Sequence, residues 1–283
     1  MKTSMKEHSS ILEIKRKSIL IRKQVVEMAA VGKTSHVGSA LSCVDLLVAL
    51  YFKIMKIDPT NWDSRGADRF ILSKGHGAKA WYATLAERGF FSKDMLKDYA
   101  KDGSGLGEHP GHGLVPGIKL STGSLGHGLS VGVGMALAKK LDQLSSRVFV
   151  IISDGECNEG SVWEGAMYAA HQKLDNLIAL IDFNKMQAMG RSMEVNALEP
   201  LKEKWKAFGW AVEEVDGHDM KRIIKVLEKL PFKKHQPSVV IAHTVLGKGV
   251  SFMEDKLLWH YQIPSEADLR QALKELESSL KKL

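Results

Sequence analysis

The chain has 283 residues, of which 44% are hydrophobic and 26% charged, a balance typical of globular proteins. Its net charge of +7 favours anionic ligands, but the basic residues are spread out, which argues against nucleic-acid binding. No segment approaches the roughly 18 apolar residues of a membrane span, and residues 1–10 lack the apolar core of a signal peptide. Cys43 and Cys157 are too few for a disulfide framework, so we expect a cytoplasmic protein that binds neither membranes nor nucleic acid.

The first part of the chain is predicted to be mainly helical, because apolar residues recur at helical spacing. Helices are expected over 11–31, 43–55, 77–88 and 93–100. The stretch 101–128 differs, since it is rich in glycine and contains three histidines. Long loops inside compact domains are usually functional or disordered. Apolar anchors such as Leu106 and Ile118 recur in this one, so we expect an ordered binding loop.

From residue 129 onward, strand and helix patterns alternate. Strands are predicted at 148–152, 177–181, 211–215 and 238–242. Helices are predicted at 129–141, 161–171, 199–208, 219–230 and 265–282. This alternation predicts an α/β fold with a doubly wound, mostly parallel sheet and helices on both faces. The length fits one domain over 1–283.

Polar residues follow two of the predicted strands at the point where each strand ends. Asp154 and Gly155 follow the first, and Asn184 follows the second, so the two oxygen-bearing side chains should emerge side by side. A carboxylate, an amide oxygen and a backbone carbonyl suit Mg²⁺ if phosphate oxygens and water complete the shell. Gly155 lets the backbone approach a phosphate, and the following helix offers free N–H groups. Alternatively, Asp154 and Asn184 simply cap helices or turns.

The spacing of these residues resembles the thiamin-diphosphate signature, in which Gly-Asp-Gly opens the motif and Asn-Asn closes it. Here 27 residues separate Gly155 from Phe183. Ser153 replaces the first glycine and Phe183 the first asparagine, while both side-chain metal ligands are kept. The resemblance implies that the Met186 carbonyl completes the protein's metal ligands. It implies thiamin diphosphate and Mg²⁺ as cofactors, for which Ca²⁺ or Mn²⁺ could substitute.

Histidine-containing segments extend this resemblance to the transketolase family. A lone histidine is more often a surface or core residue, but here five contexts match in order and approximate spacing. They are 34–36 with Ser39, 68–76, 107–110, 121–128, and 254–260. The segment Gly107-Glu108-His109-Pro110 resembles the family's Gly-His-Pro. The resemblance covers nearly the whole chain.

The resemblance implies specific roles for these residues. Histidine suits proton transfer because it titrates near neutrality. The implied cavity residues are His36, His76, His109 and His260, with His36 and His260 at substrate oxygens and His109 near the donor's hydroxyls. The implied cofactor contacts are Ser39, His76, Gly123, Leu125, Asp154, Gly155, Asn184 and His260. Glu159, and less so Glu164, would join a proton network across a dimer interface, unless they are ordinary solvated glutamates. Lys74 either helps to hold phosphate or lies on the surface.

The implied activity is that of a transketolase, a transferase of aldehyde or ketone groups in pentose phosphate metabolism. Such an enzyme moves a two-carbon ketol unit from a ketose phosphate to an aldose phosphate. The chain ends after one domain, so we expect a partner subunit with the pyrimidine-binding and C-terminal domains, as a heterotetramer with two copies of each chain. Two alternatives stay open: a deoxyxylulose-phosphate synthase or 2-oxo acid dehydrogenase type of subunit, and a non-catalytic cofactor-binding subunit.

Two further positions depart from the family pattern in its last cofactor segment. Many members carry lysine where this chain has Leu246, and glycine where it has Tyr261. A bulky Tyr261 beside His260 could narrow the donor pocket. The default donor is xylulose 5-phosphate, and a specialised catabolic sugar phosphate is the alternative.

Overall fold

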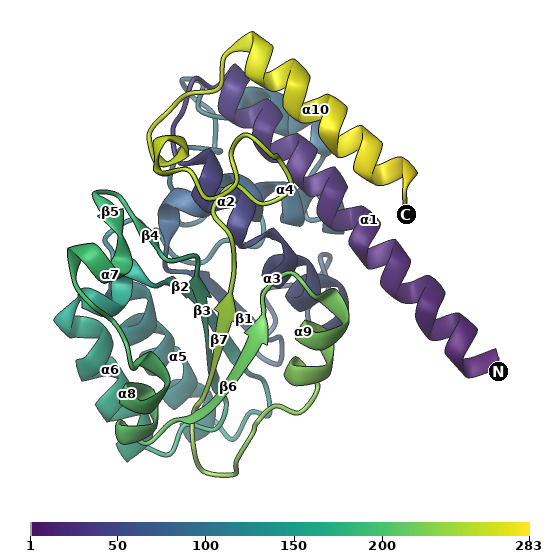
Figure 1. Cartoon of the computed structure of the whole chain (residues 1–283). Helices are drawn as coiled ribbons and strands as arrows, with labels where there is room; N and C mark the ends of the chain where they lie inside the picture. Colours follow the sequence, from purple (N-terminus) through teal and green to yellow (C-terminus); the bar gives the residue numbers. More distant parts are fainter. Residues whose placement is uncertain (1) are drawn as a thin grey trace.

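A parallel sheet of five strands forms the centre of the computed structural model, which describes residues 2–283 and the side chains from residue 11 onward (Figure 1). The strand order is β1–β2–β3–β7–β6, with every neighbouring pair parallel. The strands are β1 (Arg69–Leu72), β2 (Val148–Ser153), β3 (Leu177–Phe183), β6 (Ala211–Asp216) and β7 (Ser238–His243). After β3, β4 (Met186–Gln187) and β5 (Gly190–Arg191) form a small antiparallel hairpin. The predicted α/β fold is confirmed.

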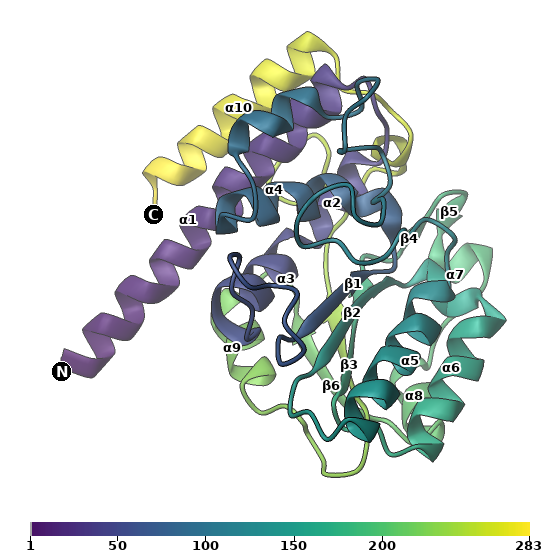
Figure 2. The same ribbon diagram turned by 180° about the vertical axis from the view of Figure 1, so that it is seen from behind.

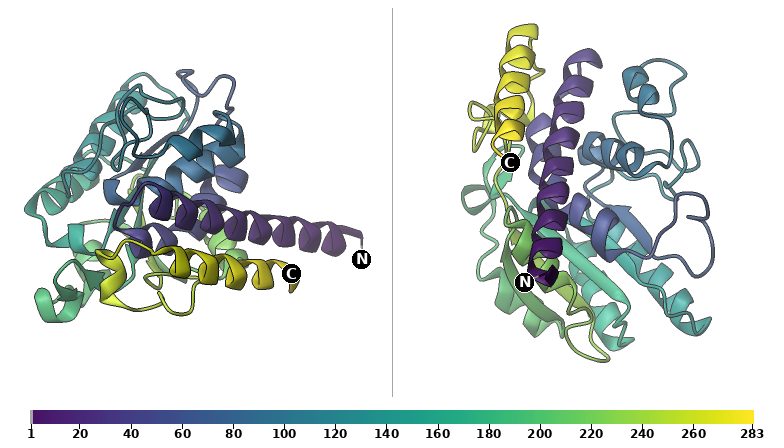
Figure 3. Two further views of the ribbon diagram at one scale, coloured as in Figure 1. Left: turned by 90° about the horizontal axis from the view of Figure 1, so that it is seen from above. Right: turned by 90° about the vertical axis from the view of Figure 1, so that its right-hand side faces the viewer.

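Helices cover both faces of the sheet (Figures 1 and 2). One core contains residues of α1 (Lys2–Val31), α3 (Val44–Ala49), α4 (Ala78–Arg88) and α9 (Met220–Leu227). The other contains residues of α5 (His127–Leu141), α6 (Gly160–His171) and α8 (Leu201–Ala207). The helix α10 (Glu266–Lys281) lies alongside α1, whose first turns extend past the body of the molecule (Figure 3).

The remaining helical segments are short. They are α2 (Val37–Ser42), α7 (Ser192–Val195), the π-helical η1 (Leu50–Ile54), and the 3₁₀ segments η2 (Gly75–Gly77), η3 (Lys93–Asp98), η4 (Gly155–Asn158) and η5 (Leu257–His260). No helix in the described part of the chain, residues 2–283, is both long and apolar enough to cross a membrane.

Strand β2 shows why the sheet is covered on both sides. All six of its residues are buried. Phe149 and Ile151 belong to the core that includes α1, whereas Val148, Val150 and Ile152 belong to the core that includes α5. Alternate side chains of a strand point to opposite faces, so a continuous apolar run satisfies two cores at once.

The structure differs from the predicted elements in several places. The helix expected over 43–55 is broken, because α3 ends at Ala49 and the chain continues as the wider π turn η1. The first helix begins well before residue 11. Strand β1 was not predicted, because its four residues carry too short an apolar run inside a charged and glycine-rich segment. The predicted C-terminal helix is confirmed, with Ser265 and Asp268 forming a capping box.

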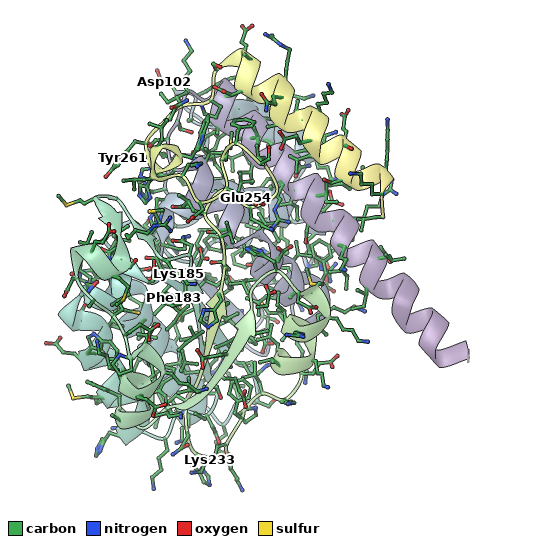
Figure 4. All side chains as sticks on the ribbon, viewed as in Figure 1. Asp102, Phe183, Lys185, Lys233, Glu254 and Tyr261 are labelled. Carbon is green, nitrogen blue, oxygen red and sulfur yellow. The ribbon has the colours of Figure 1, made fainter. Side chains whose placement is uncertain are left out.

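The carboxyl ends of the parallel strands meet at one edge of the sheet, where ligands bind in such folds. Phe183 and Lys185, which flank Asn184 at the end of β3, lie in the middle of the molecule (Figure 4). In this view Tyr261 lies above Phe183 and Lys185, whereas Lys233 lies at the opposite end of the sheet (Figure 4).

Candidate functional site

Asp154 and Asn184 emerge from neighbouring parallel strands, as the sequence predicts. Ser153 at the end of β2 is in register with Asp182 near the end of β3. Asp154 and Asn184 therefore follow at the same edge, and both are buried, with 1% and 4% of their surface exposed.

The hydrogen bonds of these two side chains agree with the capping interpretation. Asp154 Oδ1 accepts from the Gly155 N–H (3.0 Å), and Asp154 Oδ2 accepts from the Ser192 hydroxyl (2.7 Å). Asn184 Oδ1 accepts from the Met186 N–H (3.0 Å). Each side chain thus caps a backbone N–H of its own loop. Each of these three oxygens also keeps a second lone pair, with which it could bind a cation.

The donor set at this edge fits a hard divalent cation. Burial raises the pKa of Asp154 to about 7, and the neighbouring Asp182 carboxylate adds to the effect, while the bond from Ser192 opposes it. A bound cation would offset this cost of burying the charge. No group of three or more His, Cys, Asp or Glu side chains is arranged to hold a metal within the described residues. The Asn184 amide, the Met186 carbonyl and ligand oxygens would therefore have to join Asp154.

A fully buried ion pair lies next to this edge. Lys74 Nζ is 2.5 Å from Asp182 Oδ2, and both side chains have no exposed surface. Asp182 also accepts hydrogen bonds from the Ser42 hydroxyl (2.6 Å) and from the Thr244 hydroxyl. Burial alone would lower the pKa of Lys74, but the Asp182 carboxylate outweighs it and the pKa is raised. Of the two alternatives for Lys74, the surface position is therefore wrong, because its amine is held inside the fold.

A second buried carboxylate, Glu156, joins three segments of the site. Its Oε1 accepts from the Ser73 hydroxyl and from the Gly126 N–H (3.0 Å), and its Oε2 accepts from the Ser153 N–H (2.8 Å). The end of β1, the loop before α5 and the loop after β2 are thereby tied together. Burial raises the pKa of Glu156 despite these bonds.

Neither Asp182 nor Glu156 is among the predicted site residues. Both belong to the polar segments that follow the strands, which is a signal the sequence contains. Their partners, however, come from distant segments, and only the fold brings those partners to the same edge.

Three of the predicted histidines lie together. The ring centroids of His36 and His76 are 5.3 Å apart, those of His36 and His260 are 5.2 Å apart, and those of His76 and His260 are 5.9 Å apart. Burial lowers the pKa of His76 well below its ordinary value, and the Lys74 ammonium lowers it further. Burial, with smaller effects of His36 and Lys74, lowers the pKa of His260 to about 4. His76 and His260 are therefore neutral at pH 7, the form that can accept a proton.

Ser39 connects the histidine group with the buried ion pair. Its hydroxyl lies 3.5 Å from His260 Nδ1, and its carbonyl accepts a hydrogen bond from Lys74 Nζ (2.8 Å). Ser39 itself is buried on α2, with 1% of its surface exposed. The histidines and the strand-end carboxylates thus belong to one continuous polar region.

The predicted loop residues His109, Gly123 and Leu125 lie at the open side of this region. His109 is exposed, and a Cβ added at Gly123 would come within 3.0 Å of its ring. A Cβ at Gly75 would meet the backbone of Thr122 at 2.7 Å, so this loop crosses directly over η2 beside His76. Leu125 is 38% exposed.

The remaining predicted residues lie around this core. Gly155 opens η4, and Met186 is buried in β4. Glu159 and Glu164 are exposed at the start and on the surface of α6, and a Cβ at Gly126 would come 2.7 Å from Glu159 Cβ. The structure does not bring either glutamate into the histidine group.

The two departures from the expected pattern have different environments. Tyr261 is 53% exposed, and its ring lies 5.2 Å from that of His260, as the sequence order suggests. Leu246 is fully buried and packs against Gly38, where an added Cβ would come within 2.9 Å of it. A lysine at Leu246 would therefore replace a core contact.

Comparison with known proteins identifies the family of this chain. The family model described as "Transketolase, thiamine diphosphate binding domain" matches residues 15–277. One of the subunits of apulose-4-phosphate transketolase from Phocaeicola vulgatus is 43% identical over 93% of this chain and 93% of its own length. A 6-deoxy-6-sulfo-D-fructose transketolase subunit of a Clostridium species is 43% identical over 94% of this chain and 97% of its own length.

Full-length transketolases match only through one part of their length. Human transketolase is 34% identical over 92% of this chain but only 41% of its own length. The crystal structure of a Pichia stipitis transketolase superposes with a TM-score of 0.87 at 28% identity, covering 96% of this chain and 41% of that one. The chain therefore belongs to the transketolase family, in which it corresponds to the thiamine diphosphate binding domain.

Proposed function

We propose that this chain is the N-terminal subunit of a split transketolase. With a partner subunit it would transfer a two-carbon ketol unit from a ketose phosphate to an aldose phosphate. The observation that carries the proposal is the continuity of the site: neutral histidines are joined through Ser39 to the strand edge that bears Asp154 and Asn184. Proton transfer and diphosphate–metal binding would then take place side by side.

The residues would divide the work as follows. Asp154, Asn184 and the Met186 carbonyl would hold Mg²⁺. Thiamin diphosphate would contact Ser39, His76, Gly123, Leu125, Gly155 and His260. When bound, this cofactor supplies the carbon nucleophile and electron sink that cleavage of a ketose carbon–carbon bond needs. His36 and His260 would accept and return protons at substrate oxygens, and His109 would contact the donor's hydroxyls. Glu159 would join a proton network at the subunit interface.

The partner would supply the pyrimidine-binding and C-terminal domains in an assembly with two copies of each chain. The names of two relatives as transketolase subunits support this, as does the 41% share of human transketolase that the chain spans. Large apolar side chains stand exposed around the site: Met189, Met193, Leu258 and Ile263. The family model's span of 15–277 supports a single domain over 1–283. Two free, buried cysteines fit a cytoplasmic location.

The names of the relatives bear on the sugar specificity. Two relatives with the same overall identity are named for different sugars, apulose 4-phosphate and 6-deoxy-6-sulfo-D-fructose. We therefore propose that the donor is either xylulose 5-phosphate or a specialised catabolic ketose, chosen in part by the Tyr261 ring beside His260.

Co-expression with the candidate partner tests the proposal. Ketol transfer to ribose 5-phosphate would be assayed with thiamin diphosphate, Mg²⁺ and several donors, for the mixture and for each chain alone. Activity only in the mixture supports a split enzyme, and the preferred donor identifies the sugar. Cofactor binding without transfer from any donor would favour a non-catalytic role. Failure to bind cofactor even with the partner present would overturn the proposal.

A further inference from the structure

The peptide unit between Ser35 and His36 is held from both sides. Lys79 Nζ donates to the Ser35 carbonyl (2.7 Å), and the His36 N–H donates to the His260 carbonyl (3.0 Å). His36 has φ 62° and ψ 22°, in the left-handed region that non-glycine residues rarely adopt. Such a conformation persists where the surrounding contacts over-determine it, and it occurs most often at functional sites.

Lys79 has no exposed surface. Within the described part of the chain, no carboxylate lies within ion-pair distance of its amine, which is unusual for a buried lysine. Its other hydrogen bonds go to the Thr34 hydroxyl (3.3 Å) and the Tyr99 hydroxyl (3.1 Å). Burial lowers its pKa to about 8. A buried amine is costly unless its donors are satisfied, so these contacts fix the turn that presents His36.

The side chain of His36 meets a serine and a glutamate. Ser35 Oγ lies 2.8 Å from His36 Nδ1 and 3.3 Å from Glu108 Oε1, and the direct distance from Nδ1 to Oε1 is 3.4 Å. An ionised carboxylate can only accept, so the Ser35 hydroxyl donates to Glu108. The hydroxyl oxygen can then only accept from His36, which places the proton of the neutral ring on Nδ1.

We propose that Ser35 and Glu108 are positioning residues that hold His36 as its Nδ1–H tautomer, so that Nε2 is the nitrogen that accepts a substrate proton. This inference rests on the proposed function, because it concerns the ring assigned to proton transfer. A histidine that acts as a general base is often oriented by a hydrogen-bonded neighbour. The bond at one ring nitrogen fixes the proton there and leaves the other nitrogen free to accept one.

Charged and titratable groups face His36 from several elements, and their effects oppose one another. They are Lys79 on α4, Glu108 and His109 in the loop before α5, His76 in η2 and His260 in η5. Burial lowers the pKa of His36 first, and Lys79 lowers it further, while Glu108 raises it. Removing the Glu108 charge should therefore lower the pKa of His36 and shift the acid limb of its activity to lower pH.

The tautomer can be measured on the chain alone, without cofactor or partner. Two-bond ¹H–¹⁵N spectra of histidine-labelled protein distinguish Nδ1–H from Nε2–H, and His36→Asn identifies the signal. We expect Nδ1–H in the wild type, and a shift towards Nε2–H in Glu108→Ala and Ser35→Ala. Glu203→Ala, on the distant helix α8, removes the same charge and should change nothing. Should Glu108→Ala fail to fold, Glu108→Gln replaces it.

Kinetics with the partner chain supply the second readout. Loss of a residue that orients a functional histidine at a metal site typically lowers activity about 10- to 100-fold. By the same reasoning, we expect kcat of Glu108→Ala to fall about 10-fold, with KM little changed. The acid limb of kcat/KM should move to lower pH, and Glu108→Asp should restore part of the rate. A wild-type Nε2–H tautomer, or a tautomer and pH profile indifferent to Glu108, overturns the inference. If the tautomer shifts as expected but no ketol transfer occurs, the positioning of His36 by Ser35 and Glu108 stands, while the proposed function and the role of Nε2 in it fall.

Discussion

Two regions of this site are built in different ways: the strand edge, where the parallel strands end, and the rim, formed by His109, Leu125 and Tyr261. At the strand edge, carboxylates are buried and their hydrogen bonds are met within the chain, as for Asp182 with Lys74 and for Glu156 with Ser73. At the rim, His109, Leu125 and Tyr261 are exposed. The hydrogen bonds of the edge carboxylates are met within the chain, whereas the rim side chains face solvent.

This difference indicates where each kind of substitution should act. Removing one member of a buried ion pair at the edge leaves the other charge without its partner and should cost folding stability. Rim side chains face water in the isolated chain, so replacing one should leave the unfolding free energy nearly unchanged. Its effect should appear only in ligand binding and turnover. Four predictions test this division, from the largest expected effect to the smallest.

Replacing Lys74 with methionine should have the largest effect. The substitution leaves the Asp182 carboxylate buried and uncompensated, which typically costs roughly 3 to 5 kcal/mol of unfolding free energy. Denaturant unfolding followed by circular dichroism measures it. The double variant Lys74→Met/Asp182→Asn should regain part of the loss, and Lys97→Met, on an exposed pair, should lose little. Equal losses in the single and double variants would contradict the role of the pair.

Asp154→Ala should impair cofactor binding without unfolding the chain. The variant removes a carboxylate whose burial is unfavourable, so stability should be kept. It also removes the one negatively charged side chain of the proposed metal set. We expect Mg²⁺-dependent affinity for thiamin diphosphate to fall roughly 100-fold, by analogy with losses at metal sites. Calorimetric titration with and without Mg²⁺ measures this, and metal-dependent binding equal to wild type would contradict the assignment.

The histidine group should make stability fall in mild acid. The pKa of His260 is about 4 in the folded chain against 6.5 ordinarily, so the unfolded state binds more protons between these values. Stability is therefore full above about pH 6.5 and is lost as pH falls towards 4, by about 2 kcal/mol at pH 5 for this residue.

Unfolding at pH 7 and pH 5 isolates this effect when wild type is compared with His260→Asn. The variant should lose less stability in acid, because asparagine does not titrate. His171→Asn, at an exposed histidine on α6, serves as the control. A variant that loses as much stability as wild type would show that His260 is not held neutral.

Tyr261→Gly should have the smallest effect on the chain and a selective effect on the sugar. Half of the Tyr261 surface is in water, so unfolding free energy should change little. With the partner present, relative kcat/KM values for competing donors should change about 10-fold, the scale of discrimination by pocket shape. An unchanged donor profile would show that the ring does not shape the pocket.

The sequence by itself determined the periodic features of this protein. Apolar runs such as residues 148–152 have to be covered on both faces, and this requirement leads to a parallel sheet between two layers of helices. It also placed Asp154 and Asn184 at adjacent strand ends, because position after a strand is a local property. Strand β1 was missed, because four residues carry too little periodicity to stand out.

Only the tertiary structure decided which side chains pair. Lys74 and Asp182 are 108 residues apart, Ser73 and Glu156 are 83 apart, and Ser35 and Glu108 are 73 apart. A polar residue in a loop looks the same in sequence whether it faces solvent or a buried partner. The cost of burying a charge depends on groups that other strands and loops bring to it, so the burial of Lys74, the linking role of Glu156 and the tautomer of His36 follow from the packed fold alone.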